Sequence, residues 1–264
     1  MIKTPKNKLR VISVGDVHGF DTWKQALNYW RPEEEETLID QFDYIIFIGD
    51  YVDDFDHTDE QIYKNLLEII ELKEKYPHKV ILLWGNHEMH YLFGPTQHKC
   101  SGYRTSMYLR LNTLLNEKRD LFQLAFQIKN YLWTHAGVHR GWYADNIERQ
   151  TYVIRKGQEC EWLEIDKSGT IADTLNFCFE AQHQPIYDCS FYRSGRAKVG
   201  GPLWADFIET YRKPILNYHQ IIGHTRRSQI DTYTNYKGDT STTYVDCMSI
   251  EYNNYHILEI DETN

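Results

Sequence analysis

The sequence lacks the features that mark membrane, secreted and disulfide-stabilised proteins. No apolar run approaches the roughly 18 residues of a membrane span. Residues 1–10 are basic and polar and contain no apolar signal-peptide stretch. The five cysteines are widely spaced, form no CxxC pair and stand at positions 100, 160, 178, 189 and 247. These absences argue against a disulfide framework and a cysteine zinc site, and we expect reduced thiols in a cytoplasmic protein.

Positively charged residues are also fewer than negatively charged ones. The 29 Lys and Arg are outnumbered by 38 Asp and Glu, which gives a formal net charge of −9. A dedicated nucleic-acid binder needs a positive surface, so nucleic-acid binding is not expected. An enzyme that acts on anions stays possible, because bound divalent cations can reverse the local field. With 264 residues and 41% hydrophobic residues, the chain fits one large globular α/β domain.

Three short apolar runs in the first ninety residues each end in glycine and a polar residue. They cover residues 9–14, 43–48 and 79–84, and they precede Gly-Asp, Gly-Asp and Gly-Asn. Near-continuous apolar runs of about six residues are typical of strands that are buried on both faces. The pattern therefore predicts strands covered by helices.

Two helical patterns separate these runs. Asp21 is expected to cap the first helix, whose apolar residues are Trp23, Ala26, Leu27 and Trp30. Thr58 and Gln61 form a capping-box pattern for the second helix, which should run to about Tyr76 because Pro77 follows it. The order strand, helix, strand, helix, strand indicates the α/β class.

The second half of the chain is less regular. Residues 131–134 and 218–222 are strand-like, and each runs into a turn that contains His. Residues 243–247 and 254–260 predict a closing hairpin or two neighbouring strands.

Residues 142–200 have no clear strand–helix rhythm apart from a helix expected near 170–183. We expect this stretch to be an insertion or cap. The sequence has no repeat and no obvious linker. We therefore predict that residues 1–264 form a single domain.

Five strand-like runs end in turns that carry metal-binding side chains. The blocks are Gly15-Asp16-Val17-His18-Gly19, Gly49-Asp50-Tyr51-Val52-Asp53, Gly85-Asn86-His87-Glu88, His135-Ala136-Gly137 and Gly223-His224-Thr225. Any one of them alone would be ordinary turn punctuation. Five in succession are not, because ligands collect beyond the carboxyl ends of strands in α/β sheets. Carboxylate, amide oxygen and imidazole together suit Mn, Fe or Zn better than Ca²⁺.

These blocks resemble the calcineurin-like metallophosphoesterases, and most closely the branch that contains Ser/Thr phosphoprotein phosphatases and diadenosine tetraphosphatases. That branch is marked by GDxHG, GDxVDRG, GNHE, a later HAG and a further metal-binding His. Their counterparts occur here in this order between residues 15 and 225. The resemblance implies a β-sandwich of two mixed sheets flanked by helices, with the active site at the carboxyl rim of the strands.

The resemblance also implies a centre of two divalent ions, expected to be Mn²⁺ in vitro, with Fe or Zn as alternatives. The implied ligands are Asp16, His18, Asp50, Asn86, His135 and His224. Asp50 would bridge the two ions, and a metal-bridging hydroxide would attack phosphorus directly. His87 matches the family's catalytic histidine, which protonates the leaving group, and Asp53 matches the carboxylate that orients it.

One departure from the pattern concerns the substrate phosphate. Asp54 and Phe55 stand where the family has Arg and Gly, and that Arg ordinarily grips the phosphate as a bidentate donor. The candidate replacements are Arg193, Arg196 and Arg104. Each of them could equally be a surface arginine.

A further similarity lies in Gly201-Pro202-Leu203-Trp204-Ala205-Asp206, which resembles the LWSDP-type segment of this branch. Asp206 is therefore expected to support the site from behind, and Trp204 to pack. Asp246 has a familiar position, but the sequence assigns it no role.

The sequence predicts a dimetal phosphatase that hydrolyses phosphate monoesters, similar to protein Ser/Thr phosphatases. The alternative is a phosphodiesterase or a nucleoside-polyphosphate hydrolase of the diadenosine tetraphosphatase kind. The complete ligand set together with His87 argues against a non-catalytic binding protein. The expected partner is a phosphorylated protein, nucleotide or small molecule, with no membrane involved.

Overall fold

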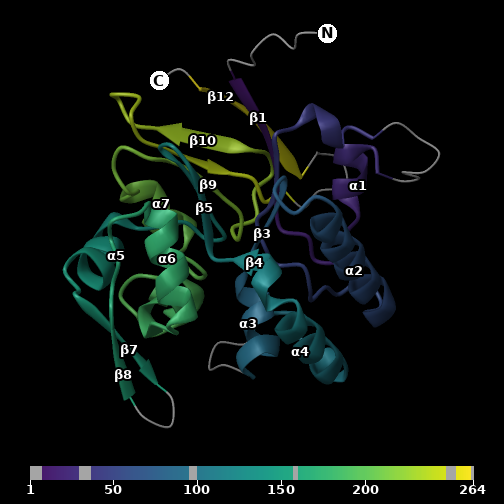
Figure 1. Ribbon diagram of the computed structural model, residues 1–264, viewed down its shortest axis with the longest axis horizontal. Coiled ribbons are helices and arrows are strands. Elements are labelled where there is room, and N and C mark those ends of the chain that lie inside the picture. Colours follow the sequence, from purple (N-terminus) through teal and green to yellow (C-terminus); the bar gives the residue numbers. More distant parts are fainter. Residues whose placement is uncertain (1–7, 30–36, 95–99, 157–159, 248–253, 263–264) are drawn as a thin grey trace.

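The computed structural model describes residues 8–29, 37–94, 100–156, 160–247 and 254–262. Trp30, expected on the first helix, lies outside these residues. In the part of the chain so described, two five-stranded sheets and one short hairpin form the β-structure (Figure 1).

The first sheet has the strand order β12-β1-β2-β3-β4. Its strands are β1 (Lys8–Val14), β2 (Tyr44–Phe47), β3 (Val80–Leu83), β4 (Phe122–Gln123) and β12 (Tyr255–Asp261). Strands β1 to β4 are parallel, and β12 pairs antiparallel with β1. The three apolar runs at the start of the chain are thus the central strands, as predicted.

The second sheet has the order β10-β11-β9-β6-β5. Its strands are β5 (Ala125–Ile128), β6 (Tyr131–Thr134), β9 (His219–Ile222), β10 (Asp231–Thr234) and β11 (Ser241–Tyr244). Strands β6, β9 and β11 are parallel, whereas β5 and β10 pair antiparallel at the edges. Both sheets are therefore mixed.

An apolar core lies between the two sheets. It combines side chains of the first sheet, such as Val11 and Ile46, with Trp133 and Ile221 of the second. The indole of Trp133 also donates a hydrogen bond of 2.9 Å to the Ser13 hydroxyl across the sheets. Because side chains alternate along a strand, the neighbouring residues of β1 and β2 point the other way, toward the helices. The predicted β-sandwich is confirmed.

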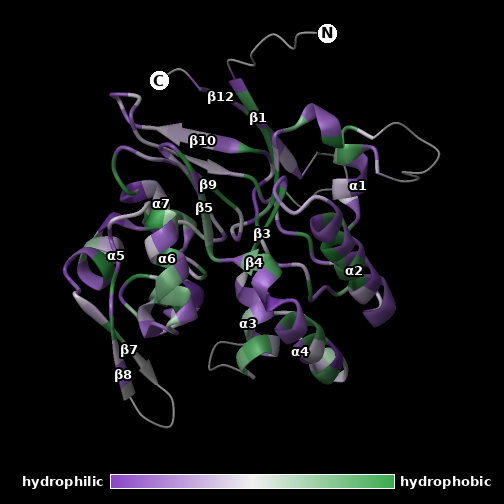
Figure 2. Cartoon of the chain, viewed as in Figure 1, coloured by the Kyte–Doolittle hydropathy of each residue, from purple (hydrophilic) through white to green (hydrophobic). Residues whose placement is uncertain are grey.

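Helices cover both outer faces of the sandwich (Figure 1). On the side of the first sheet lie α1 (Thr22–Leu27), α2 (Asp59–Lys75), α3 (Asn86–Phe93) and α4 (Tyr108–Glu117). On the other side lie α5 (Arg140–Tyr143), α6 (Ile171–Glu180) and α7 (Phe207–Arg212). Figure 2 shows hydrophobic residues gathered in the central strands, while the outer helices carry both hydrophobic and hydrophilic residues. Among the described residues, no helix has the length and apolar character needed to cross a bilayer.

The helices begin at the residues that the capping patterns in the sequence predict. Thr58 and Gln61 form the expected reciprocal capping box at the start of α2, and Tyr76 ends that helix. Asp21 stands at the N-cap of α1, although its side chain makes no capping hydrogen bond. Thr170 caps α6 through a second capping box.

The expected pairing of the last two strands is wrong. β11 lies in the second sheet between β10 and β9, whereas β12 pairs with β1 in the first sheet. The register joins Leu9 to Ile260 and Val14 to Tyr255, which buries the edge of β1.

The region of residues 142–200 contains an irregular set of elements. They are a π-helix (Ala144–Glu148), the hairpin of β7 (Tyr152–Lys156) and β8 (Cys160–Glu164), helix α6, and short 3-10 turns. Helix α6 packs on β5, and Asn176 donates to and accepts from the β5 backbone.

Candidate metal centre

The predicted ligands follow strands that end at one rim of the sandwich. Asp16, Asp50 and Asn86 come after β1, β2 and β3, whereas His135 and His224 come after β6 and β9. A direct contact joins the turns after the two sheets here: the backbone N–H of His224 donates to the Asp16 carboxylate at 2.9 Å. The sequence expectation that these blocks converge is therefore met.

Asp50 lies at the centre of this group. Its Oδ2 is 3.3 Å from Nε2 of His135, 3.8 Å from Nε2 of His18 and 3.9 Å from Nε2 of His87. Its other oxygen accepts a 3.0 Å hydrogen bond from the backbone of His87. One carboxylate oxygen thus faces three imidazoles, and the opposite oxygen is held by the start of α3.

Backbone carbonyls orient two of these imidazoles. Nδ1 of His18 lies 2.9 Å from the carbonyl oxygen of Val52 and 2.7 Å from that of Asp53. Nδ1 of His135 lies 2.8 Å from the carbonyl oxygen of Ile48. A carbonyl partner on Nδ1 leaves Nε2 as the free donor atom, which is the usual outer support of a metal-binding histidine.

The donor atoms fall into two clusters that share Asp50. One joins His18, Asp50 and His87, and the other joins Asp50, His135 and His224, with the donor atoms of each cluster within 4.8 Å of one another. Asn86 belongs beside the second cluster, because its Oδ1 is 2.8 Å from Nε2 of His135. A carboxylate common to two clusters fits a bridging ligand of a two-ion centre.

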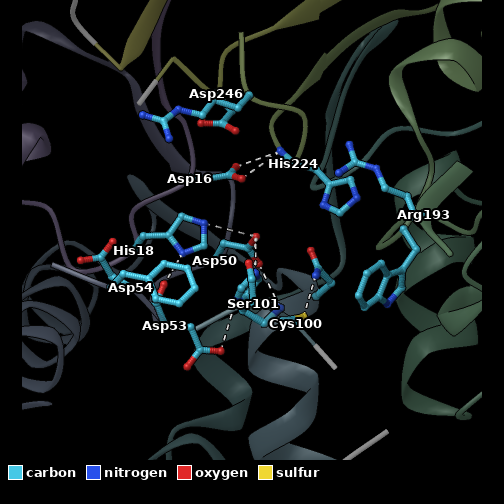
Figure 3. Close-up of a pocket in the computed structure, with 15 residues that line it drawn as sticks. Asp16, His18, Asp50, Asp53, Asp54, Cys100, Ser101, Arg193, His224 and Asp246 are labelled. Atoms are coloured by element: carbon cyan, nitrogen blue, oxygen red, sulfur yellow. Dashed lines mark hydrogen bonds and ion pairs between the residues drawn. The ribbon is translucent and has the colours of Figure 1, made fainter. Parts of the chain in front are cut away.

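Asp16 stands slightly apart from both clusters. Its carboxylate accepts from the backbone N–H of His224, and a Cβ at Gly223 would come within 2.1 Å of its Oδ1. Glycine is required there so that the carboxylate can approach the second sheet. Asp246, at the end of β11, is also buried in this corner of the cavity (Figure 3).

Burial and neighbouring charges shift the pKa values of the ionisable groups in the site in different directions. Burial and the neighbouring Asp246 raise the pKa of Asp16 well above its usual value. Burial would also raise the pKa of Asp50, but His135 and His87 hold it well below its usual value. Burial and Arg193 lower the pKa of His224, so this imidazole is neutral. Its buried Nε2 has no hydrogen-bond partner in the part of the chain that the structure describes. Buried carboxylates and a neutral imidazole together are a suitable donor set for divalent cations.

We predict that metal binding releases protons at neutral pH. In the ion-free chain, burial lowers the pKa values of His18 and His135, but Asp50 and Asp16 together with backbone carbonyls more than offset this and bring them to about 9 and about 10. Both imidazoles are then protonated, whereas a metal ligand must be neutral. Ions and protons compete, so the affinity for Mn²⁺ should rise with pH until both groups are deprotonated. Calorimetry in two buffers with different ionisation enthalpies measures the released protons, and a value of zero would contradict this ligand assignment.

Four of the predicted site residues have a left-handed backbone. Their φ angles are 45° for His18, 49° for Asp50, 65° for Asp53 and 63° for His224. Such a conformation costs a non-glycine residue on the order of 1 kcal/mol, and it persists where surrounding contacts fix it. Here the backbone N–H of His18 donates to the Asp50 carbonyl oxygen at 2.7 Å. The concentration of strain at this rim is typical of a functional site.

His87 and Asp53 form the pair expected from the sequence. Nδ1 of His87 lies 3.0 Å from Oδ2 of Asp53, and both side chains are buried. Sequence reasoning missed a third member, Tyr91, whose hydroxyl donates to the other oxygen of Asp53. Tyr91 lies four residues after His87, so both project from the same side of α3. This four-residue spacing is the sequence signal that could have indicated Tyr91.

Glu88 was also missed, although its motif was recognised. Its buried carboxylate accepts hydrogen bonds from the backbone N–H groups of Gly85, Asp50 and Tyr51, at 2.9, 3.1 and 2.8 Å. It thereby joins the turn after β2 to the turn after β3. Burial and the neighbouring Asp50 raise the pKa of Glu88 to about 7.

A cavity of about 330 Å³ opens onto these residues. Of the three arginines considered for the phosphate, only Arg193 lines it, on the side opposite Asp53 and Asp54 (Figure 3). Arg196 is exposed on the surface outside it. Arg226, which the sequence did not single out, is a second arginine in the lining.

Asp206 supports Arg193 from behind, in agreement with its expected place. Its carboxylate lies 2.8 Å from Nε of Arg193, and its side chain also caps α7 by accepting from the backbone of Ile208. Arg193 further donates to the hydroxyl of Thr225, next to His224. Trp204 lines the cavity, with its ring centroid 5.9 Å from that of His224, rather than serving only as core packing.

Asp54 accepts hydrogen bonds within its own loop. Its carboxylate accepts from the backbone N–H groups of Asp56 and His57, at 2.8 and 2.7 Å, and lies 2.7 Å from the ring Nδ1 of His57. Arg104 lies behind this loop, where it pairs with Asp59 at 2.6 Å. The structure therefore does not bring Arg104 to the cavity.

Comparisons with known proteins agree with this geometry. A family model described as calcineurin-like phosphoesterase matches residues 9–227. The cold-active protein-tyrosine phosphatase of a psychrophile, Shewanella sp., is 16% identical with a TM-score of 0.55, over 96% of this chain and 76% of that one. Another structure of a cold-active protein tyrosine phosphatase is also 16% identical, with a TM-score of 0.53, over 91% and 70%. At these identities the solved structures show the fold alone.

A protein serine/threonine phosphatase from Saccharomyces cerevisiae is 17% identical with a TM-score of 0.47, over 98% of this chain and 82% of that one. No curated protein sequence matches the chain. The family model spans more than four-fifths of the chain and includes all five blocks at the rim. The chain therefore belongs to the calcineurin-like phosphoesterases and is a metal-dependent hydrolase of phosphoric esters.

Proposed function

We propose that this protein is a phosphatase that hydrolyses phosphate monoesters. The observation that carries the proposal is the position of Asp50, which is shared by two donor clusters and lies next to the His87–Asp53 pair. The proposed ion ligands are Asp16, His18, Asp50, Asn86, His135 and His224. Two bound divalent ions would polarise the phosphate and activate the attacking water.

The remaining steps belong to side chains of the protein. His87, held by Asp53 through Nδ1, presents Nε2 to the cavity and is placed to donate a proton to the leaving oxygen. Arg193, on the wall opposite Asp54, and Arg226, a second arginine of the lining, replace the missing family arginine as donors to the phosphate. The ion pair with Asp206 keeps Arg193 in that orientation.

The volume of the open cavity, only about 330 Å³, favours a monoester over a bulkier diester or nucleoside polyphosphate. The GNHE block is common to protein phosphatases and diadenosine tetraphosphatases, so it supports phosphoester hydrolysis without choosing between them. The Shewanella protein of similar fold is a protein-tyrosine phosphatase, which makes a tyrosine phosphopeptide a reasonable test substrate. We also propose that residues 142–200 are an insertion and that the protein is cytoplasmic.

Activity assays with Mn²⁺ test this function directly. The substrates are p-nitrophenyl phosphate, bis-p-nitrophenyl phosphate, a phosphopeptide and diadenosine tetraphosphate. The proposal expects turnover of the two monoesters to exceed that of the diester. Preference for diadenosine tetraphosphate or the diester would favour the alternative hydrolase, and no turnover of any substrate would indicate a non-catalytic protein.

Replacing Tyr91 with phenylalanine should lower kcat about 10-fold, the effect of one hydrogen bond to a charged group. The hydroxyl donates to Asp53, and its loss frees Asp53 and hence His87 to reorient. KM should change little, because Tyr91 is buried and does not line the cavity. Steady-state kinetics measure the effect, with Tyr236→Phe as the exposed control. An increase in KM at constant kcat would show that Tyr91 acts on substrate binding instead.

A further inference from the structure

Phe55 is an exposed aromatic residue in the wall of the metal-site cavity. Its side chain is 78% exposed although it belongs to the cavity lining. The residue before it, Asp54, lies across the cavity from Arg193 (Figure 3). An exposed phenylalanine at this position contributes no core packing, so its position calls for another explanation.

The loop that carries Phe55 is fixed from the inside. The Asp54 carboxylate accepts from two backbone N–H groups that follow Phe55, those of Asp56 and His57. The ring of His57 also contacts the ring of Phe20 edge to face, at a centroid distance of 4.4 Å.

Arg104 fixes the same loop from the outside. Its guanidinium donates to the carbonyl oxygens of Asp54 and His57, on either side of Phe55, and pairs with Asp59. These bonds fix the backbone on both sides of Phe55 and hence the direction in which its side chain leaves the loop. Little backbone freedom is therefore lost when the ring contacts a ligand.

The position of Phe55 relative to His87 indicates which half of a bound ester Phe55 would contact. His87 is the group placed to protonate the leaving oxygen, and it is bound to Asp53, two residues before Phe55. The phosphate-binding arginine, Arg193, lies on the opposite wall. The alcohol half of a bound ester therefore points toward the loop of Phe55, whereas its phosphate points away from it.

We propose that Phe55 is a specificity residue that packs against an aromatic leaving group, so that aryl phosphate monoesters are the preferred substrates. This inference rests on the proposed monoesterase function and names its substrate class. The tyrosine side chain of a phosphoprotein and a small phenolic phosphate share this chemistry. A nucleoside monophosphate differs, because a ribose separates its aromatic base from the ester oxygen.

The test compares substrates within each variant. Wild type, Phe55→Ala, Phe55→Tyr and the control Tyr236→Ala are assayed with Mn²⁺ on phenyl phosphate, a tyrosine phosphopeptide, phosphoserine and adenosine monophosphate. Tyr236 is 93% exposed and is not part of the cavity lining, so its replacement tests the loss of a surface ring alone. The ratio of kcat/KM for phenyl phosphate to that for phosphoserine cancels any general change in the enzyme.

We expect Phe55→Ala to lower this ratio about 3- to 10-fold, as expected for the loss of one aromatic contact. The tyrosine phosphopeptide should follow phenyl phosphate, Phe55→Tyr should restore the ratio, and Tyr236→Ala should leave it unchanged. As a binding readout, phenylphosphonate should lose inhibitory potency against Phe55→Ala by a similar factor, while methylphosphonate should not.

Two results overturn the inference. Either Phe55→Ala leaves the ratio unchanged, or it lowers turnover of adenosine monophosphate without affecting phenyl phosphate. In both cases the wild type still hydrolyses monoesters, so the proposed function survives. If the wild type hydrolyses none of the four substrates, the proposed function itself fails, and the two failures are distinguished by the wild-type assay.

Discussion

Replacing Asp50 with asparagine is expected to lower kcat/KM about 10³-fold or more, the effect of losing several kcal/mol of metal-based charge stabilisation. Metal content should fall below that of the wild type in the same preparation. The change keeps the size of the side chain and the acceptor for the His87 backbone, but it removes the charge. No other described side chain belongs to both donor clusters.

The electrostatics of the rim explain the size of this effect. Asp50 is the main group that raises the pKa values of His18 and His135, and its Oδ2 lies within 4 Å of three imidazoles. An asparagine amide cannot offer a negative oxygen to two cations at once. Both proposed ions therefore lose the negative charge of their shared ligand through a single substitution.

Elemental analysis after dialysis against Mn²⁺, together with steady-state kinetics on p-nitrophenyl phosphate, measures both effects. Asp40→Asn is the matched control, because Asp40 is exposed and, among the described residues, makes only a 3.5 Å ion pair with Lys79. Wild-type metal content in Asp50→Asn would rule out the bridging role.

The sequence predicted the parts of the site that are encoded by short local patterns. The blocks at Asp16, Asp50, Asn86, His135 and His224 each combine a β-rich run, a turn and a ligand-type side chain, and the structure brings them to one rim. The capping boxes are equally local, since Thr58 and Gln61 are three residues apart. Patterns of this length fix an element without any knowledge of its neighbours.

The parts that were missed depend on contacts between distant segments. β12 pairs with β1 across about 250 residues, a register that no local pattern encodes. Asp246 follows a Thr-rich strand without a glycine turn, so its burial beside Asp16 had no local signal. Arg104 was considered for the phosphate, but its partners are Asp59 and two carbonyl groups some fifty residues earlier.

Replacing His87 with asparagine is expected to lower kcat about 10²- to 10⁴-fold on phosphoserine, the range of general acid catalysis. The loss should be much smaller on p-nitrophenyl phosphate, because p-nitrophenolate is a stable anion that leaves without a proton. Asp53→Asn should show the same dependence on the leaving group with a smaller loss, since Asp53 acts only by orienting His87.

The same variant decides between two sets of ligands for the ion beside His18. His87 belongs to one donor cluster with His18 and Asp50, whereas Asp16 lies outside that cluster and accepts from the backbone of His224. If His87 is the proton donor and Asp16 the ligand, His87→Asn keeps its metal and Asp16→Asn loses it. The reverse result would make His87 a ligand, and no residue would then be assigned to protonate the leaving oxygen. Elemental analysis of the two variants and the leaving-group dependence of kcat together separate the two arrangements. Loss of an ion slows hydrolysis of phosphoserine and p-nitrophenyl phosphate alike. Loss of the acid slows mainly the hydrolysis of phosphoserine, the alkyl ester.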